Sequence, residues 1–217
     1  MAILSDLVER IAEVEGIDPA TVSLIARHIR EDGLIATHGR GPSAAKMSFA
    51  DAANLLIGVN ATTTVANAAR TVRAYRRLQA WDFRSLSDPR PPSSLGTLST
   101  VIEQLLDSVA KGELPEPFLK QNFDWGFQEA FSKGQVHIGL RFRRSVTTAY
   151  LRMTELPGPD VIERDAPEEW LAMMPSRLSV VFRPVVPRGP PRKSASDRID
   201  EVTIGYRTLR AVGQLIA

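Results

Sequence analysis

The chain contains no cysteine, few histidines and no long apolar run. Without cysteine no disulfide framework can form, and His28, His38 and His137 are too few to provide the ligands of a structural zinc site. No apolar stretch approaches the roughly 20 residues of a membrane-spanning helix. The first residues alternate charged and apolar side chains, unlike a secretory signal, so we expect the chain to begin near Met1. These absences favour a soluble, cytoplasmic protein without a metal or other cofactor.

Positive charge is unevenly distributed along the chain. The net charge is only +2, yet the interval 20–80 holds eight Arg and Lys residues against three acids. The basic residues are Arg27, Arg30, Arg40, Lys46, Arg70, Arg73, Arg76 and Arg77. A local excess of this kind, rather than the net charge, indicates an interaction with nucleic acid.

Two segments rich in proline, serine and glycine interrupt the apolar patterning. They span residues 85–96 and 187–197, and both have the composition of linkers. The remaining sequence, with 43% hydrophobic residues overall, is sufficient to fill a core. We therefore expect an N-terminal module at 1–84, a linker at 85–96, and a second module at 97–217 that forms a dimer or binds a partner.

Apolar residues at helical spacing predict the first two helices of the N-terminal module. The first begins at Leu4 and stops at Gly16. The second has Asp18 at its N-cap and Pro19 at its first position, and it ends at Gly33. Only a tight turn separates the two helices.

The sequence after Gly33 has the pattern of a wing followed by a third helix. Residues 34–37 are predicted to be a short strand and are followed by a glycine-punctuated loop. Ser48 and Asp51 then form a variant of the capping box, which predicts the next helix. The module is thus expected to run helix, turn, helix, strand, loop, helix.

The downstream sequence mixes helical and strand patterns. A helix is predicted over 65–80, with Arg70, Arg73 and Arg77 on one side, and another from a capping box of Thr100 and Glu103. Apolar residues alternate over 136–142 and 178–182, which predicts two or three antiparallel strands. Residues 199–216 have the spacing of a coiled-coil seam, so we expect a C-terminal helix. The expected fold class is α+β.

The predicted helix 19–31 has the properties of a DNA-reading helix. Its apolar stripe would face the scaffold, leaving a polar face with basic residues toward base edges and phosphates. Arg27, in mid-helix, could contact guanine in the major groove, and Arg30, nearer the end, could hold a phosphate. The other expected contact residues of this helix are Ala20, Thr21, Ser23, Leu24 and His28.

The segment from Ala20 to Gly41 resembles the winged helix-turn-helix family. The resemblance covers about residues 5–60 and is carried by Ile29, Arg30, Gly33, Leu34 and Ile35. It implies a wing whose basic tip touches the minor groove or the DNA backbone. Arg40, between two glycines, suits the tip, and His38 and Lys46 complete the expected contacts. The chain is also similar in style to proteins of bacterial prophages and gene-transfer-agent clusters.

Motifs of common enzyme classes are absent from the sequence. The segment GRGPSAAK suggests a phosphate loop, but Ala45 stands where the glycine before the lysine is required, and Met47 replaces the magnesium-binding Ser or Thr. Nucleophile-elbow and zinc-protease motifs are also missing. We therefore expect a protein that is not an enzyme.

The leading hypothesis is a sequence-specific, double-stranded DNA-binding regulator of transcription. One short helix reads few base pairs, so a homodimer is expected, with the transcription machinery as a further candidate partner. One alternative is a DNA-packaging phage component similar to a small terminase. Another is a protein-interaction module in which the helix-turn-helix serves only as a scaffold. Salt-dependent DNA binding distinguishes that scaffold from a DNA-binding protein.

Overall fold

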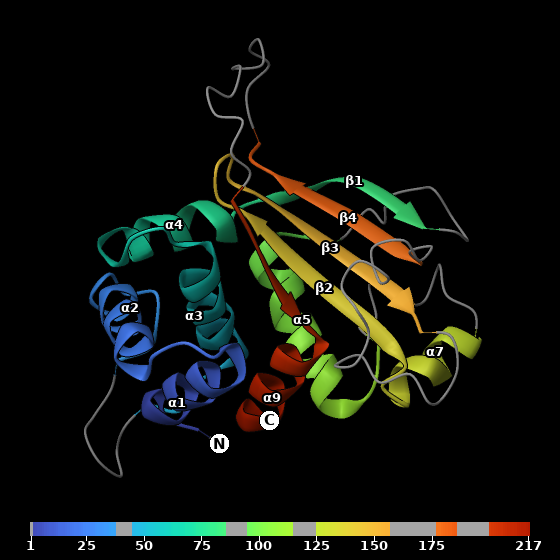
Figure 1. The fold of residues 1–217 in the computed structure, drawn as a ribbon, viewed down its shortest axis with the longest axis horizontal. Coiled ribbons are helices and arrows are strands. Elements are labelled where there is room, and N and C mark those ends of the chain that lie inside the picture. The colour runs from blue at the N-terminus through green and yellow to red at the C-terminus, as the bar shows by residue number, and fades with distance from the viewer. Residues whose placement is uncertain (1, 38–44, 86–94, 115–124, 157–176, 186–199) are drawn as a thin grey trace.

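A computed structural model describes residues 2–37, 45–85, 95–114, 125–156, 177–185 and 200–217. These residues form seven α-helices, a short 3-10 helix and a five-stranded antiparallel sheet. The α+β class expected from the sequence is confirmed. Figure 1 shows the N-terminal helices gathered on one side of the molecule and the sheet on the other.

The three helices predicted near the N-terminus are confirmed. They are α1 (Leu4–Glu15), α2 (Pro19–Glu31) and α3 (Phe49–Ala61). The predicted capping box of α3 also forms. The Asp51 backbone N–H donates to Ser48 Oγ at 3.2 Å, and the Ser48 N–H donates to Asp51 Oδ2 at 2.9 Å. Local sequence signals therefore fix where α3 begins.

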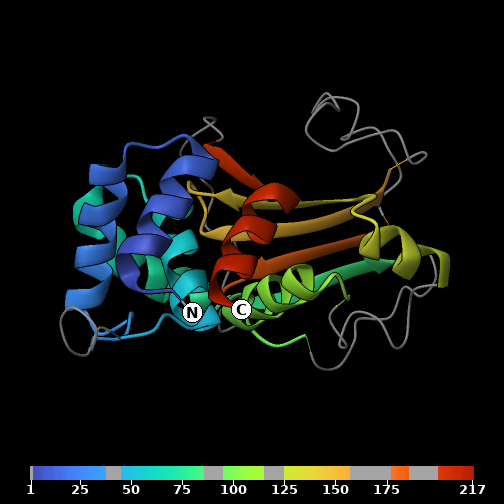
Figure 2. The ribbon, with the colours of Figure 1, turned by 90° about the horizontal axis from the view of Figure 1, so that it is seen from below.

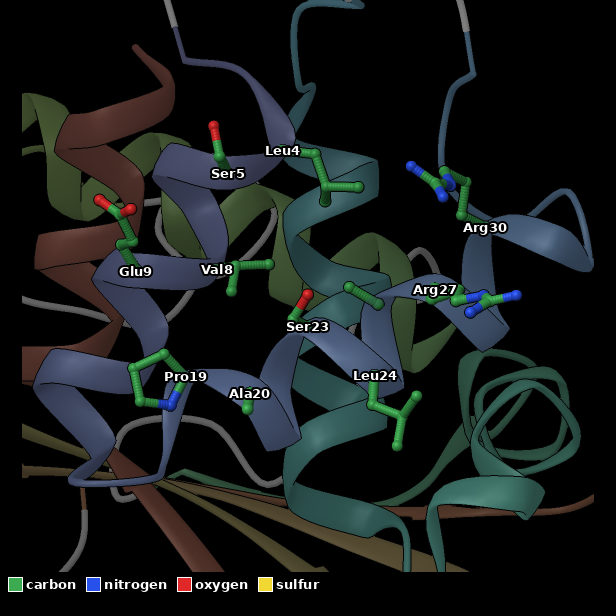
Figure 3. A pocket seen from close by; sticks show the side chains of 11 residues that line it. Leu4, Ser5, Val8, Glu9, Pro19, Ala20, Ser23, Leu24, Arg27 and Arg30 are labelled. Atoms are coloured by element: carbon green, nitrogen blue, oxygen red, sulfur yellow. The ribbon is translucent and has the colours of Figure 1, made fainter.

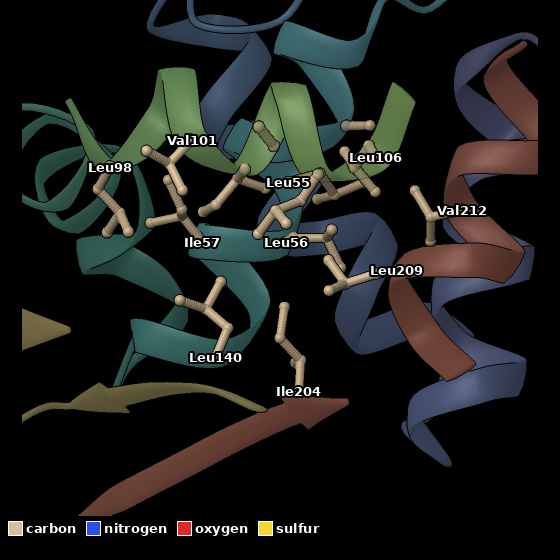
Figure 4. Packing of buried hydrophobic residues seen from close by; sticks show 14 of the residues in the cluster. Leu55, Leu56, Ile57, Leu98, Val101, Leu106, Leu140, Ile204, Leu209 and Val212 are labelled. Atoms are coloured by element: carbon tan, nitrogen blue, oxygen red, sulfur yellow. The ribbon is translucent and has the colours of Figure 1, made fainter. Parts of the chain in front are cut away.

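Helix α3 is the centre of the molecule. Every residue from Asp51 to Ala61 is buried, as expected of a helix that is hydrophobic on all sides. Helices α1, α2 and α4 form an outer layer, in which α2 and α4 pack directly on α3. The other side of α3 meets α5, α9 and the sheet, and Figure 4 shows Leu55, Leu56 and Ile57 within that core.

The sheet is fully antiparallel, with strand order β1-β4-β3-β2-β5. The strands are β1 (Gln79–Ser85), β2 (Val136–Arg143), β3 (Thr148–Glu155), β4 (Leu178–Arg183) and β5 (Glu201–Gly205). The strands predicted at 136–142 and 178–182 are confirmed as β2 and β4. Their alternating apolar residues are buried, and Figure 4 shows Leu140 of β2 and Ile204 of β5 facing the helices.

The predicted helix over 65–80 is confirmed up to Arg76 and is wrong only in its last four residues. The 3-10 helix spans Val65–Asn67, α4 spans Ala68–Arg76, and the chain then turns into β1. Strand β1 pairs with β4, with a bulge between Ala80 and Asp82. Pairing with a strand about a hundred residues away overrides the local helical pattern, which the sequence alone does not reveal.

Three further helices complete the fold: α5 (Leu98–Lys111), α7 (Trp125–Ser132) and α9 (Tyr206–Ile216). The N-cap of α5 is Thr97, and the predicted capping residue Thr100 lies inside the helix and donates its N–H to Thr97 Oγ1. The helix begins one turn earlier than expected because Leu98 is fully buried. Figure 4 shows Leu98 in the core.

The C-terminal seam predicted over 199–216 is not an exposed helix. Its first part is β5, which pairs with β2, and only α9 is helical. Leu209 and Val212 of α9 are fully buried, because α9 packs against α5 and α1 of the same chain. The seam is therefore part of the core, and it is not available to form the expected homodimer.

One hydrophobic cluster includes residues on both sides of the predicted linker 85–96. The contacts of α1 with α9, and of α3 with α5, connect the segments 1–84 and 97–217. Figure 2 shows α1 and α9 next to each other. The core is thus not divided at the expected module boundary. Most of both predicted linkers lies outside the described residues.

Candidate nucleic-acid interface

The turn between α1 and α2 is as short as the sequence predicts. Helix α1 ends at Gly16, which has a φ of 65°. Asp18 is the N-cap of α2, and its Oδ2 accepts hydrogen bonds from the Thr21 backbone N–H at 3.1 Å and the Thr21 hydroxyl at 3.2 Å. Helices α1 and α2 are therefore joined by a tight turn at residues 16–18, and the cap at Asp18 fixes where α2 begins.

The two sides of α2 separate as predicted from its helical spacing. The buried residues are Val22, Ile25, Ala26 and Ile29. The expected contact residues lie on the opposite side, where His28 is half-buried and the others are exposed. The exposed residues are Ala20, Thr21, Ser23, Leu24, Arg27 and Arg30. Leu24 has 47% of its surface exposed, which is ordinary for a single surface leucine. This side of α2 is free of packing contacts that would hide it.

The two arginines of α2 differ in their partners. Arg27 donates from Nε to Glu31 Oε1 at 2.7 Å, and its side chain is 64% exposed. This hydrogen bond raises the pKa of Arg27 and lowers the pKa of Glu31, so the pair stays ionised even in mildly acidic solution. Arg30 has no ion-pair partner among the described residues. Its charge is therefore not neutralised within that part of the chain.

Side chains of α3 fix the end of α2. Asn54 donates from Nδ2 to the Leu34 carbonyl at 2.7 Å, and Asp51 Oδ1 accepts from the Ala36 N–H at 2.9 Å. A Cβ added to Gly58 would lie 2.3 Å from Cδ1 of Ile29, so this glycine lets α2 pack closely on α3. The orientation of α2 is thus set by the buried central helix.

A regular two-stranded wing is not formed by the described residues on either side of the loop. Residues 34–37 and 45–48 are not strands, so the predicted strand 34–37 is wrong. The backbone groups that a strand pair would need are already hydrogen-bonded elsewhere. The Leu34 carbonyl and the Ala36 N–H bond to side chains of α3, and the Met47 N–H donates to the Ala2 carbonyl. Lys46 is exposed. His38 and Arg40 lie outside the described residues.

A groove of about 700 Å³ runs between α1 and α2. Figure 3 shows its side chains: α1 supplies apolar and polar groups, and α2 supplies small, apolar and basic ones. The lining residues are Leu4, Ser5, Val8, Glu9, Pro19, Ala20, Ser23, Leu24, Ala26, Arg27 and Arg30. Five of the expected contact residues therefore border one groove. The α1 side of the groove was not predicted, although Leu4 and Val8 at a spacing of four residues are a recognisable apolar edge.

Helix α4 borders the other side of α2. Arg73 Nη2 lies 2.8 Å from Oδ2 of Asp32, the residue that follows α2, and donates to the Asp32 carbonyl at 3.3 Å. Asp32 follows His28 by four residues, so at about 100° per residue both lie on one side of α2. Ser23 and Arg30 line the α1 groove instead. The exposed face of α2 therefore lies between α1 and α4.

Other features of the described residues complete the site. No group of three or more His, Asp or Glu side chains there is placed to hold a metal ion. No helix in that part of the chain has the length and apolar character needed to cross a membrane. Comparisons with models of protein families, with curated proteins and with solved structures found no match to this chain. The function must therefore be argued from the geometry of the site itself.

Proposed function

We propose that this chain binds double-stranded DNA in a sequence-specific manner and regulates transcription, with α2 as its reading helix. The observation that carries the proposal is the exposed face of α2, which combines small polar residues with Arg27 and Arg30. An α-helix fits the major groove of DNA, where a guanidinium can donate two hydrogen bonds to guanine. The tight turn at 16–18 and the buried scaffold α3 would hold α2 in position.

The two arginines have different expected roles. Arg27 lies in the middle of the exposed face, where Nη1 and Nη2, which its bond to Glu31 leaves free, could reach a base edge. Arg30 lies nearer the helix end and has no acidic partner among the described residues, which suits a phosphate contact. Base contacts give specificity, and phosphate contacts give affinity that depends on salt.

The test begins with the full chain and a library of randomised DNA duplexes. A DNA-binding regulator should enrich a defined sequence, and its affinity should fall steeply with salt. Arg27→Ala should then reduce the preference for that sequence by about 1–3 kcal/mol. Arg10→Ala is the matched control, because Arg10 is a partly exposed arginine of α1 that also pairs with a glutamate, Glu13.

A second candidate function has one specific observation in its favour. The groove between α1 and α2 has an apolar part, to which Leu4, Val8 and Leu24 contribute, as a protein-interaction module would require. Such a module would enrich no DNA sequence and would show no salt-dependent DNA affinity.

A DNA-packaging component would instead bind DNA as a large ring. Light scattering of the full chain would detect that assembly.

A further inference from the structure

Helix α4 carries a row of exposed arginines. The segment 68–77 contains four arginines and no acid. Its apolar side, which includes Val72 and Tyr75, is buried. Arg70, Arg73 and Arg77 are spaced by three and four residues, so they lie along one side of the helix, and all three are exposed.

This row lies beside the exposed face of α2. The ion pair of Arg73 with Asp32 brings that side of α4 to the end of α2. Arg70 and Arg77 lie one turn before and one turn after Arg73. Neither has an acidic partner within the described ranges. Two positive charges are therefore left uncompensated next to the proposed reading helix.

The length of the row matches a DNA backbone. Arg77, the C-cap of α4, follows Arg70 by seven residues, which corresponds to about 10 Å along the helix axis. Neighbouring phosphates of one DNA strand rise by about 3.4 Å along the duplex axis and lie farther apart along the strand itself. The row is therefore long enough for Arg70 and Arg77 to meet different phosphates of one strand.

The opposite side of α2 has a mixed charge. Glu9 of α1 is exposed, lines the same groove as Arg27 and Arg30, and has no basic partner in the portion of the chain described. Its carboxylate would repel a phosphate that came close to α1. The row on α4 has no such unpaired acid beside it among the described residues, so the α4 side attracts a polyanion more strongly than the α1 edge of the groove.

We propose that α4 is a phosphate-anchoring helix, which holds one DNA strand along Arg70, Arg73 and Arg77 and shifts the duplex toward α4 and away from Glu9. This inference rests on the proposed function, because it assumes that α2 enters the major groove. It adds a second contact element and defines on which side of α2 the DNA backbone is held most tightly.

The test is a titration of the full chain with a labelled duplex carrying the enriched sequence, repeated over a range of salt concentrations. In the double variant Arg70→Gln, Arg77→Gln, the plot of log affinity against log salt should become shallower by about two units, because two phosphate contacts are lost. The preference for the enriched over a scrambled sequence should remain. Glu9→Gln should raise affinity about two- to fivefold at low salt only.

Two controls keep the result interpretable. Arg207→Gln, Arg210→Gln removes two exposed arginines from α9 and should leave the salt slope unchanged. Arg70→Lys, Arg77→Lys keeps the charge and should also preserve the slope. A wild-type slope in the glutamine variant, or an equal loss in the lysine variant, would overturn the anchoring role of α4.

The outcome separates this inference from the proposed function. If the wild-type chain enriches a sequence and Arg27→Ala weakens that preference, α2 is the reading helix whatever α4 does. An unchanged slope in the glutamine variant would then refute α4 alone. If the wild-type chain binds no DNA, both proposals fail together.

Discussion

Nε of Arg27 donates a hydrogen bond of 2.7 Å to Oε1 of Glu31, one turn further along α2. Both side chains are more than half exposed, and the bond directs the guanidinium along the helix rather than away from it. The bond engages Nε alone and leaves Nη1 and Nη2 free to donate elsewhere. The carboxylate of Glu31 nevertheless offsets part of the positive charge of Arg27.

Replacing Glu31 by Gln should strengthen DNA binding. The expected gain is about two- to fivefold at low salt, because an exposed ion pair of this kind contributes little energy and is screened by salt. Fluorescence anisotropy with the enriched duplex measures it. In the background of Arg27→Ala the same substitution should produce a smaller gain. An equal gain in both backgrounds would show that Glu31 acts on DNA directly and not through Arg27.

Truncating Leu209 should destabilise the whole chain. This side chain of α9 is fully buried in the core that α9 shares with α5 and α3. Leu209→Ala is therefore expected to lower the free energy of unfolding by about 2–5 kcal/mol, measured by urea denaturation. The exposed neighbour Arg210 is the control, and Arg210→Ala should change stability by less than about 0.5 kcal/mol. If the Leu209→Ala chain kept its stability and differed from the wild-type chain only in its oligomeric state, Leu209 would instead lie at a dimer contact.

Two buried glycines should respond differently to alanine. A Cβ at Gly213 would lie 2.3 Å from the backbone oxygen of Leu106, so α9 would have to move away from α5. At Gly58 the same distance leads to Cδ1 of Ile29, the end of a flexible side chain. We expect Gly213→Ala to lower the free energy of unfolding by about 1–3 kcal/mol and Gly58→Ala by less. Urea denaturation of both variants checks this order, and the reverse order would contradict the packing described.

Glu15 should make stability depend on pH. Burial raises the pKa of Glu15, and a hydrogen bond to Thr208 of α9 opposes this effect. The folded chain thus holds this proton more tightly than the unfolded chain, so the contribution to stability is greatest at low pH and is lost as pH rises through the raised pKa. Glu15→Gln should therefore stabilise the chain at about pH 7 and have a smaller effect at about pH 4. Equal effects at both pH values would indicate a packing effect instead.

The helices of the N-terminal layer could be predicted because their signals are local. Asp18 with Pro19 marks the start of α2, and Ser48 with Asp51 marks the start of α3. Strand β1 and the C-terminal strand β5 could not be predicted, because their partners β4 and β2 are distant in sequence. The C-terminal helix was predicted and is present as α9, but the packing partner of its seam could not be predicted, because the apolar spacing is the same whether the seam faces another chain or its own core.

The candidate site was predictable for α2 but not for its surroundings. Helical spacing alone separated the buried Val22 from the exposed Arg27. The strand at 34–37 was mispredicted because the sequence does not show that Asn54 and Asp51 take up the backbone groups a strand pair would need. The proximity of Arg73 to Asp32 likewise depends on how α4 packs on α3, and no local signal encodes it.

The packing of α1 against α9 has a consequence for how the protein is made. Helices α1 to α4 leave the ribosome well before residues 206–216 are synthesised, and until then the apolar surface of α1 that α9 covers is open to water. Contacts between the two ends of a chain form late, and exposed apolar surface invites aggregation in the interval. Chaperone binding to the nascent chain would protect this surface. A chain released before α9 is complete would lack a finished core, and α2 would rest on an unstable support.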